Sequence, residues 1–184
     1  MKRLWTWLNI TFWLVIGGLF FVWVNNELEF REELEERLLP EELHPIVEEK
    51  SKQLLNQTEE IGIPIIISEG YRSVESQDVL YSKGRSMEGN IVTYARGGES
   101  FHNYGLAIDF ALKNKDGSIS YDLQRDSNGN GKPDWFEVVA IGKNLGFSSG
   151  ADWSGFKDYP HFEYTFDLSI RELQNGWRPE DKNR

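Results

Sequence analysis

The hydrophobic pattern divides the chain into an apolar N-terminal segment and a longer region of mixed character. Residues 4–24 carry no charge and consist mainly of Leu, Ile, Val, Phe and Trp. A helix of this length spans roughly 30 Å, the thickness of the hydrocarbon core of a bilayer. Lys2 and Arg3 precede the segment and glutamates follow it, so the positive-inside rule predicts a single-pass membrane anchor with the rest of the chain outside the cytoplasm.

A cleaved signal peptide is the alternative interpretation of this segment. Its apolar stretch would be shorter and would end in small residues, whereas this one ends Phe-Val-Trp-Val-Asn-Asn. We therefore expect the anchor to be retained. The predicted organisation is an anchor at 1–24, a juxtamembrane helix or stalk at 25–39, a folded domain at 40–176 and a tail at 177–184.

Beyond residue 39, helical and strand periodicities follow each other without a regular alternation. An apolar stripe that includes Leu43, Val47 and Leu54 predicts a helix that starts at Pro40. The predicted helices are 40–60, 73–83, 133–145 and 169–174, and the predicted strands are 64–67, 106–112 and 161–166. This order indicates an α+β domain in which helices flank a small mixed or antiparallel sheet.

Composition narrows the classes of function. With 184 residues, the chain has room for one domain with a substantial core. It has no cysteine, which excludes a disulfide framework and a thiolate metal site. Outside the predicted anchor there are 18 basic and 30 acidic residues, a net charge of -12. Such a surface argues against nucleic-acid binding and is compatible with a small or cationic peptide substrate.

Two of the three histidines lie in short motifs that indicate a metal site. His102 and Asp109 belong to Ser-Phe-His-Asn-Tyr-Gly-Leu-Ala-Ile-Asp, and His161 ends Asp-Tyr-Pro-His. A catalytic zinc needs three protein ligands and an open position, which two imidazoles and a carboxylate provide. Gly105 would let the chain turn between His102 and Asp109, and His161 would come from a neighbouring strand. Any one of these histidines alone would more often be a packed or solvated side chain.

Together, these motifs resemble peptidase family M15, the zinc peptidases that include the D-Ala-D-Ala dipeptidases and carboxypeptidases of bacterial cell walls. His-Asn-Tyr-Gly-Leu-Ala-Ile-Asp-Phe and Phe-Lys-Asp-Tyr-Pro-His-Phe are similar to the L-alanyl-D-glutamate endopeptidase branch of wall hydrolases and phage endolysins. The similarity covers roughly residues 42–176. It implies a fold like that of these peptidases and of the hedgehog domain, with peptidoglycan stem peptides as substrate and no obligate protein partner.

The resemblance also implies roles for further residues. Asp158, three residues before His161, matches the general base, a position where many members carry Glu. Ser100 matches a residue that helps to position the water or the substrate. Arg72 and Gln77 match the pair that binds the substrate carbonyl and stabilises charge.

Other side chains are expected around the metal. Glu163 shares the strand face of His161 and is a second candidate base, although a solvent-facing carboxylate is the simpler interpretation. We expect Trp153 and Tyr104 to wall the substrate groove.

A second metal pattern follows the central strand. The segment from Asp126 to Glu137 reproduces the twelve-residue calcium loop, with a glycine at its sixth position and a helix after it. No convincing helix enters the loop, and its Asn-Gly repeats are also compatible with an ordinary turn. The predicted calcium ligands are Asp126, Asn128, Asn130, Lys132 through its carbonyl, Asp134 and Glu137.

Three functional hypotheses follow from these motifs. The first is a zinc peptidase that cuts the L-Ala–D-Glu bond of stem peptides. The second is a D-alanyl-D-alanine carboxypeptidase, because the motifs are common to both. The third, of a different class, is a module that keeps the fold and the zinc for binding to the cell wall.

Overall fold

The computed structural model describes the backbone of residues 2–183 and the side chains of residues 12–182. The chain divides into two compact units. One contains the residues up to 38 together with 175–177, and the other contains residues 39–174 together with those from 178 onward. The metal motifs and the calcium-like loop all belong to the second unit.

The first unit is built on one continuous helix, α1 (Lys2–Glu36), where the sequence suggested an anchor followed by a stalk. The ring of Phe30 packs edge-on against Trp177, with centroids 5.5 Å apart. Among the residues with described placement, no helix is long and apolar enough to cross a membrane. The predicted anchor is therefore not supported by the structure, and the side chains of its residues 4–11 lie outside the described part.

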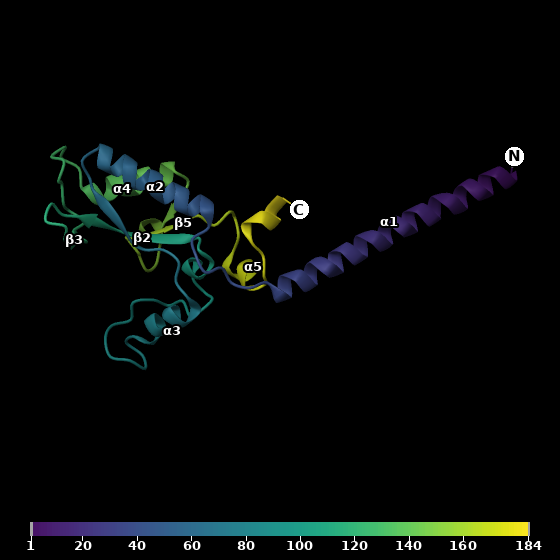
Figure 1. Ribbon diagram of the computed structural model, residues 1–184, viewed down its shortest axis with the longest axis horizontal. Helices are drawn as coiled ribbons and strands as arrows, with labels where there is room; N and C mark the ends of the chain where they lie inside the picture. The colour runs from purple at the N-terminus through teal and green to yellow at the C-terminus, as the bar shows by residue number, and fades with distance from the viewer. Residues whose placement is uncertain (1, 184) are drawn as a thin grey trace. The chain divides into compact units, whose positions relative to one another are not determined.

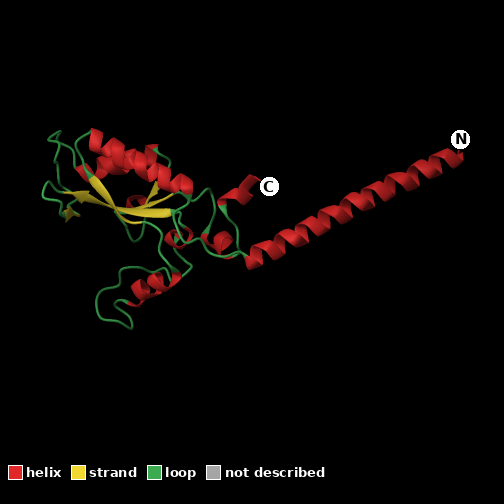
Figure 2. Ribbon diagram, viewed as in Figure 1, coloured by secondary structure: helices red, strands yellow, loops and turns green. Residues whose placement is uncertain are grey.

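The second unit is an α+β domain, as predicted (Figure 2). Its α-helices are α2 (Pro45–Glu60), α3 (Val74–Ser82), α4 (Asp134–Asn144) and α5 (Ile170–Gln174). Its strands are β1 (Ile65–Glu69), β2 (Ala107–Lys113), β3 (Ile119–Ser120), β4 (Ser148–Ser149) and β5 (His161–Glu163). Its 3₁₀ turns are η1 (Phe101–Tyr104), η2 (Gly150–Asp152) and η3 (Pro179–Asn183).

All pairings of the sheet are antiparallel, in the order β1-β2-β5-β4, with β3 paired to β2. Helices α2 and α4 lie together on one face, and α3 lies on the opposite side (Figure 1). The central strand β2 is buried almost throughout, including Ile108 and Phe110. Phe110 stacks on Phe162 and contacts Trp135 of α4, so the core lies between β2 and the two helices. This core supports the sheet, whose opposite face carries the metal motifs.

Two details of the predicted elements were wrong. Helix α2 begins at Pro45 instead of Pro40, because Nδ1 of His44 accepts the amide proton of Ile46 and Pro45 occupies the first turn. Strands β3 and β4 were missed because each has only two residues, too few to show a period of two.

Candidate metal centre

The register of the sheet places the carboxylate and one histidine of the predicted metal site side by side. Asp109 on β2 pairs with His161 on β5 and with Glu69 on β1. Paired residues of neighbouring strands direct their side chains to the same face. Glu69, Asp109 and His161 therefore form a row across three strands, on the face opposite α2 and α4. A bulge between Ile67 and Glu69 adjusts the end of β1 to this row.

The second histidine comes from η1, immediately before β2. The hydroxyl of Ser100 caps this turn by accepting the amide proton of His102 at 3.4 Å. Gly105 ends the turn in the left-handed region with φ 66°, and a methyl group there would lie 2.2 Å from the carbonyl oxygen of Glu42. Only glycine fits this close approach, which lets the chain reverse between His102 and Asp109. Ser100 lines the groove, and the contact that the structure gives its hydroxyl is this structural cap.

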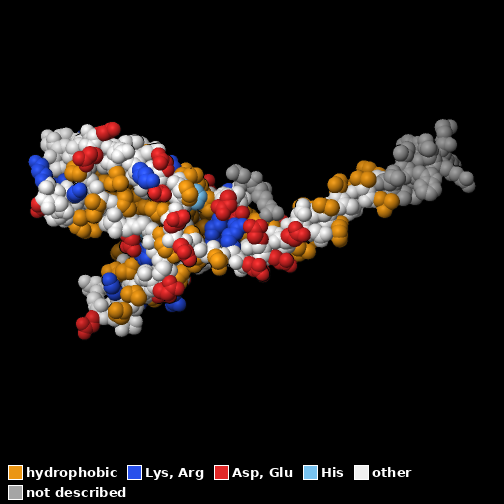
Figure 3. Space-filling view, viewed as in Figure 1, with side chains coloured by type: hydrophobic (Ala, Val, Ile, Leu, Met, Phe, Trp, Pro, Cys, Tyr) orange, Lys and Arg blue, Asp and Glu red, His pale blue; other side chains and the backbone are white. Residues whose placement is uncertain are grey.

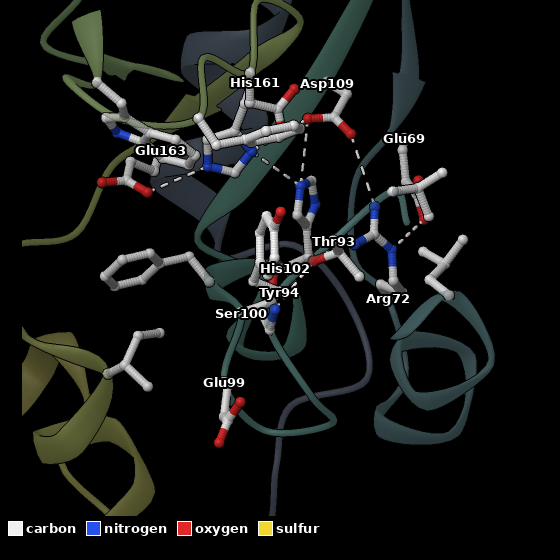
Figure 4. Close-up of a pocket in the computed structure, with 18 of the residues that line it drawn as sticks. Glu69, Arg72, Thr93, Tyr94, Glu99, Ser100, His102, Asp109, His161 and Glu163 are labelled. Atoms are coloured by element: carbon white, nitrogen blue, oxygen red, sulfur yellow. Dashed lines mark hydrogen bonds and ion pairs between the residues drawn. The ribbon is translucent and has the colours of Figure 1, made fainter. Parts of the chain in front are cut away.

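His102, Asp109 and His161 converge as the sequence predicted (Figure 4). Nε2 of His102 lies 3.2 Å from Nδ1 of His161 and 3.3 Å from Oδ1 of Asp109. The third side of the triangle, Nδ1 of His161 to Oδ1 of Asp109, is 3.2 Å. Ligand atoms about 2.0–2.1 Å from a tetrahedral zinc lie about 3.3–3.4 Å apart, so the triangle has the size of a zinc site.

The outer nitrogen of each imidazole faces a hydrogen-bond acceptor. Nδ1 of His102 is 2.7 Å from the carbonyl oxygen of Gly70, and Nε2 of His161 is 3.2 Å from Oε2 of Glu163. A neutral imidazole has one N–H and one lone pair, so a proton on each outer nitrogen leaves the inner nitrogens as acceptors. Three acceptor atoms in van der Waals contact repel one another unless a cation lies between them. The three atoms, each with a lone pair directed toward the others, therefore fit a metal ion.

Electrostatics at the triangle favour positive charge. Burial alone would raise the pKa of Asp109, but hydrogen bonds from His102 and His161 hold this pKa well below its usual range. Burial alone would lower the pKa of His161, whereas the carboxylates of Asp109 and Glu163 raise it to about 9. The two histidines thus keep Asp109 ionised, and the carboxylates of Asp109 and Glu163 compensate a positive charge in a buried place.

Arg72 lies beside the triangle and is nearly buried. Its Nη2 is 3.7 Å from Oδ2 of Asp109, and its Nε donates to Glu69 at 2.5 Å. Its Nη1 donates to Oε1 of Gln77 at 2.7 Å. Gln77 has no exposed surface, and its amide nitrogen donates to the carbonyl of Ala95 at 2.8 Å. In this structure Gln77 therefore positions Arg72 and holds the segment around Ala95, and its contact with substrate stays a prediction.

This arrangement predicts the effect of changing Gln77. Gln77→Leu removes the acceptor of Arg72 and the donor to Ala95, both buried, which costs roughly 1–3 kcal/mol of folding stability for unsatisfied groups. Because Arg72 loses its fixed position, we expect kcat/KM to fall while zinc content stays unchanged. Thermal melting, metal analysis and peptide hydrolysis would measure these three quantities. Gln77→Glu keeps an acceptor for Arg72 and is expected to recover part of the activity.

Asp158 reaches the same groove from the loop before β5. Its main chain is fixed by Gly150, whose carbonyl accepts the amide proton of Asp158 at 3.1 Å. A methyl group at Gly150 would lie 2.4 Å from the carbonyl oxygen of Asp158 and 3.1 Å from Cβ of His161. Burial, and next the charge of Asp109, raise the pKa of Asp158, whereas His161, His102 and Arg72 lower it. A carboxylate with a raised pKa is suited to taking up and releasing a proton.

The groove around these side chains has a volume of about 960 Å³. Trp153 lines it and packs against His161, with ring centroids 5.2 Å apart. Tyr94 and Phe156 approach each other edge-on from two loops of the rim, with centroids 5.9 Å apart. Tyr104 does not wall the groove as predicted, because it is buried and donates its hydroxyl proton to the carbonyl of Gly98.

The calcium-like loop has a defined conformation. The carboxylate of Asp126 accepts the amide protons of Gly129, Asn130 and Gly131 at 2.8–3.1 Å. The side-chain amide of Asn130 donates to Oε1 of Glu137 at 2.8 Å, and the other oxygen of Glu137 is buried without a hydrogen-bond partner. Glu137 lies in the helix that leaves the loop, as predicted.

Asp134 departs from the calcium pattern. It is fully buried, and its Oδ2 lies 3.1 Å from Nε of Arg125 and 2.7 Å from the hydroxyl of Ser127. Within the described part of the chain, the triangle around His102 is the one cluster of metal-ligating side chains, and the acidic groups of this loop form no comparable cluster. Asn128 donates to the carbonyl of Ile61, and the amide of Lys132 donates to Asn130.

Comparison with known proteins agrees with this geometry. A family model described as D-alanyl-D-alanine carboxypeptidase, of the M15 group, matches residues 93–164. The peptidoglycan L-alanyl-D-glutamate endopeptidase CwlK of Bacillus subtilis (strain 168) is 54% identical over 150 residues, which cover 82% of this chain and 90% of that protein. The chain belongs to the M15 peptidase family. It is accordingly a zinc metallopeptidase.

Two further relatives of this M15 peptidase are more distant. The L-alanyl-D-glutamate peptidase of Listeria phage A118 is 31% identical over 116 residues, 63% of this chain and 36% of the phage protein. The solved structure of the LdcB LD-carboxypeptidase has a TM-score of 0.50 and 22% identity, with 78% of this chain and 76% of that chain covered. The structural likeness supports the fold alone.

Proposed function

We propose that this chain is an L-alanyl-D-glutamate endopeptidase that cuts the stem peptides of peptidoglycan. The observation that carries the proposal is the 54% identity to CwlK along 90% of its length. The triangle of His102, Asp109 and His161, which could hold a metal ion, supports the same conclusion.

The groove supplies the groups that such a hydrolysis needs. His102, Asp109 and His161 would hold the zinc ion, which would supply an activated water and a Lewis acid for the scissile carbonyl. Asp158 takes the proton of the attacking water and delivers it to the leaving amine. Arg72, held by Glu69 and Gln77, directs a guanidinium toward the oxyanion that develops on the carbonyl. One such donor contributes about 3–4 kcal/mol of transition-state stabilisation.

The bond that is cut can be identified directly from the products. The zinc-loaded chain is incubated with a purified L-Ala-D-Glu-containing stem peptide, and the released ends are identified by mass spectrometry. We expect a free L-alanine carboxylate on one product and a free D-glutamate amine on the other. Release of D-alanine alone would contradict the proposal. It would instead support a D-alanyl-D-alanine carboxypeptidase, the activity that the matching family model describes.

We also propose that the catalytic unit works outside the cytoplasm, where its substrate lies. The support is in the sequence, which places Lys2 and Arg3 before an uncharged stretch and glutamates after it. Large apolar side chains between Phe12 and Trp23 of α1 are exposed, and Figure 3 shows them along the described part of this helix.

A calcium ion in the loop from Asp126 to Glu137 is a further proposal, supported by the ligand spacing and by the unpartnered buried oxygen of Glu137. We expect millimolar Ca²⁺ to raise the melting temperature of the zinc-saturated chain, by the linkage between binding and folding. Asp126→Ala is expected to remove this response. Asp116→Ala, in the exposed turn after β2, is the control that should keep it. An unchanged melting temperature in the unmodified chain would exclude the site.

A further inference from the structure

The two histidines of the metal triangle present different nitrogens to it. His102 uses Nε2, and His161 uses Nδ1. The two rings therefore need opposite tautomers, because the nitrogen that binds a metal must carry a lone pair while the other carries the proton. When a metal is bound, something in the protein must hold the remaining proton of each ring on its outer nitrogen and orient the ring.

For His102 the main chain holds this proton. Its Nδ1 lies 2.7 Å from the carbonyl oxygen of Gly70, which can only accept a hydrogen bond. No substitution of a side chain removes this acceptor. For His161 the corresponding partner is a side chain, since Oε2 of Glu163 lies 3.2 Å from Nε2.

We propose that Glu163 is a positioning residue that holds His161 in the Nε2–H tautomer, so that the lone pair of Nδ1 faces the metal. The two residues lie two apart on β5 and share one face of the sheet. Glu163 is opposite Ala107 on β2, whose small side chain leaves space beside it. The side chain of Glu163 is only 15% exposed, and that of His161 only 7%, so water competes weakly for this hydrogen bond.

The same geometry argues against the role of second base for Glu163. Its carboxylate meets the outer nitrogen of His161, so the imidazole ring stands between this carboxylate and the three ligand atoms (Figure 4). Asp158 and Glu163 both line the groove, but the contact with the outer nitrogen of His161 belongs to Glu163. A carboxylate that accepts from the far nitrogen of a metal-bound histidine fixes the ring and makes the ligand more basic.

This inference rests on the zinc site of the proposed function, but not on which peptide bond is cut. Its test is therefore zinc affinity, measured without substrate by competition with a chelator. Glu163→Ala is expected to weaken zinc binding by ~10–100-fold, the usual effect of removing such a partner. Glu163→Gln keeps a carbonyl oxygen that can accept from Nε2–H, so we expect it to recover most of the affinity. Glu59→Ala, at the exposed end of α2, is the control with no change.

The tautomer itself is visible by ¹⁵N NMR of the histidine rings. In the zinc-loaded unmodified chain we expect His161 to carry its proton on Nε2. This measurement does not depend on whether the variants fold. A proton on Nδ1 would overturn the proposal. So would a folded Glu163→Ala variant with unchanged zinc affinity. If that variant lost activity at unchanged affinity, Glu163 would act on the substrate and the positioning role would be refuted.

Discussion

His102→Ala is expected to abolish zinc binding and, with it, peptide hydrolysis. The change removes one corner of a triangle whose three atoms lie 3.2–3.3 Å apart, and the two remaining ligands cannot complete a catalytic zinc site. Enzymes accelerate their reactions by at least ~10⁶-fold, so we expect a loss of at least ~10⁴-fold in activity. Metal analysis after dialysis and hydrolysis of a stem peptide would measure both effects.

His44 provides a matched control because it is the third histidine and lies outside the groove. It caps α2 by accepting the amide proton of Ile46, and asparagine is a favoured residue at such a position. His44→Asn should therefore retain both zinc and activity. We also expect that excess zinc does not restore activity to His102→Ala. If this variant bound zinc with wild-type affinity, the metal would be held elsewhere.

The metal site could be predicted because its chemistry is local in sequence. His102, Gly105 and Asp109 lie within eight positions, and their order of loop, turn and strand determines that the two ligands meet. His161 could be assigned only by its motif. Its distance to Asp109 depends on the antiparallel pairing of β2 with β5, which no local pattern reveals.

The roles of Gln77 and Glu163 could not be predicted in the same way. Gln77 is a polar residue in a nine-residue helix, and nothing in its neighbourhood indicates that it is completely buried. The alternation of β5 placed Glu163 on the correct face, but the sequence suggested either a base or a solvated side chain. Its actual partner, the outer nitrogen of His161, depends on the orientation of a ring.

The calcium-like loop shows the limit of a spacing argument. The pattern correctly placed the glycines, the turn and the helix after it. It could not anticipate that Asp134 pairs with Arg125, because Arg125 lies one residue before the motif. A buried carboxylate with a guanidinium partner has less reason to face a cation in the loop.

Asp158→Asn is expected to lower kcat by ~10²–10⁴-fold while zinc affinity stays unchanged. Asparagine has nearly the same shape as aspartate but cannot accept a proton, so the variant removes the acid–base step and keeps the groove. Asp158 is not part of the metal triangle, and its loop is held through main-chain contacts with Gly150 that the change preserves. A discontinuous assay of stem-peptide hydrolysis, with metal analysis of the same sample, would separate a change in kcat from a change in zinc binding.

The neighbouring Asp152 makes this test specific. It ends η2, six residues earlier, and is half-exposed in an ion pair with Lys143 at 2.7 Å. An exposed pair of this kind contributes little, so Asp152→Asn should leave kcat and zinc affinity as they are. If Asp158→Asn hydrolysed peptides at the wild-type rate, Asp158 could not be the base. If the unmodified, zinc-loaded chain bound stem peptides without cutting them, it would be a wall-binding module. If instead Asp158→Asn lost kcat at full zinc occupancy and Asp152→Asn did not, the chain would be an enzyme that moves a proton at the carboxylate of Asp158.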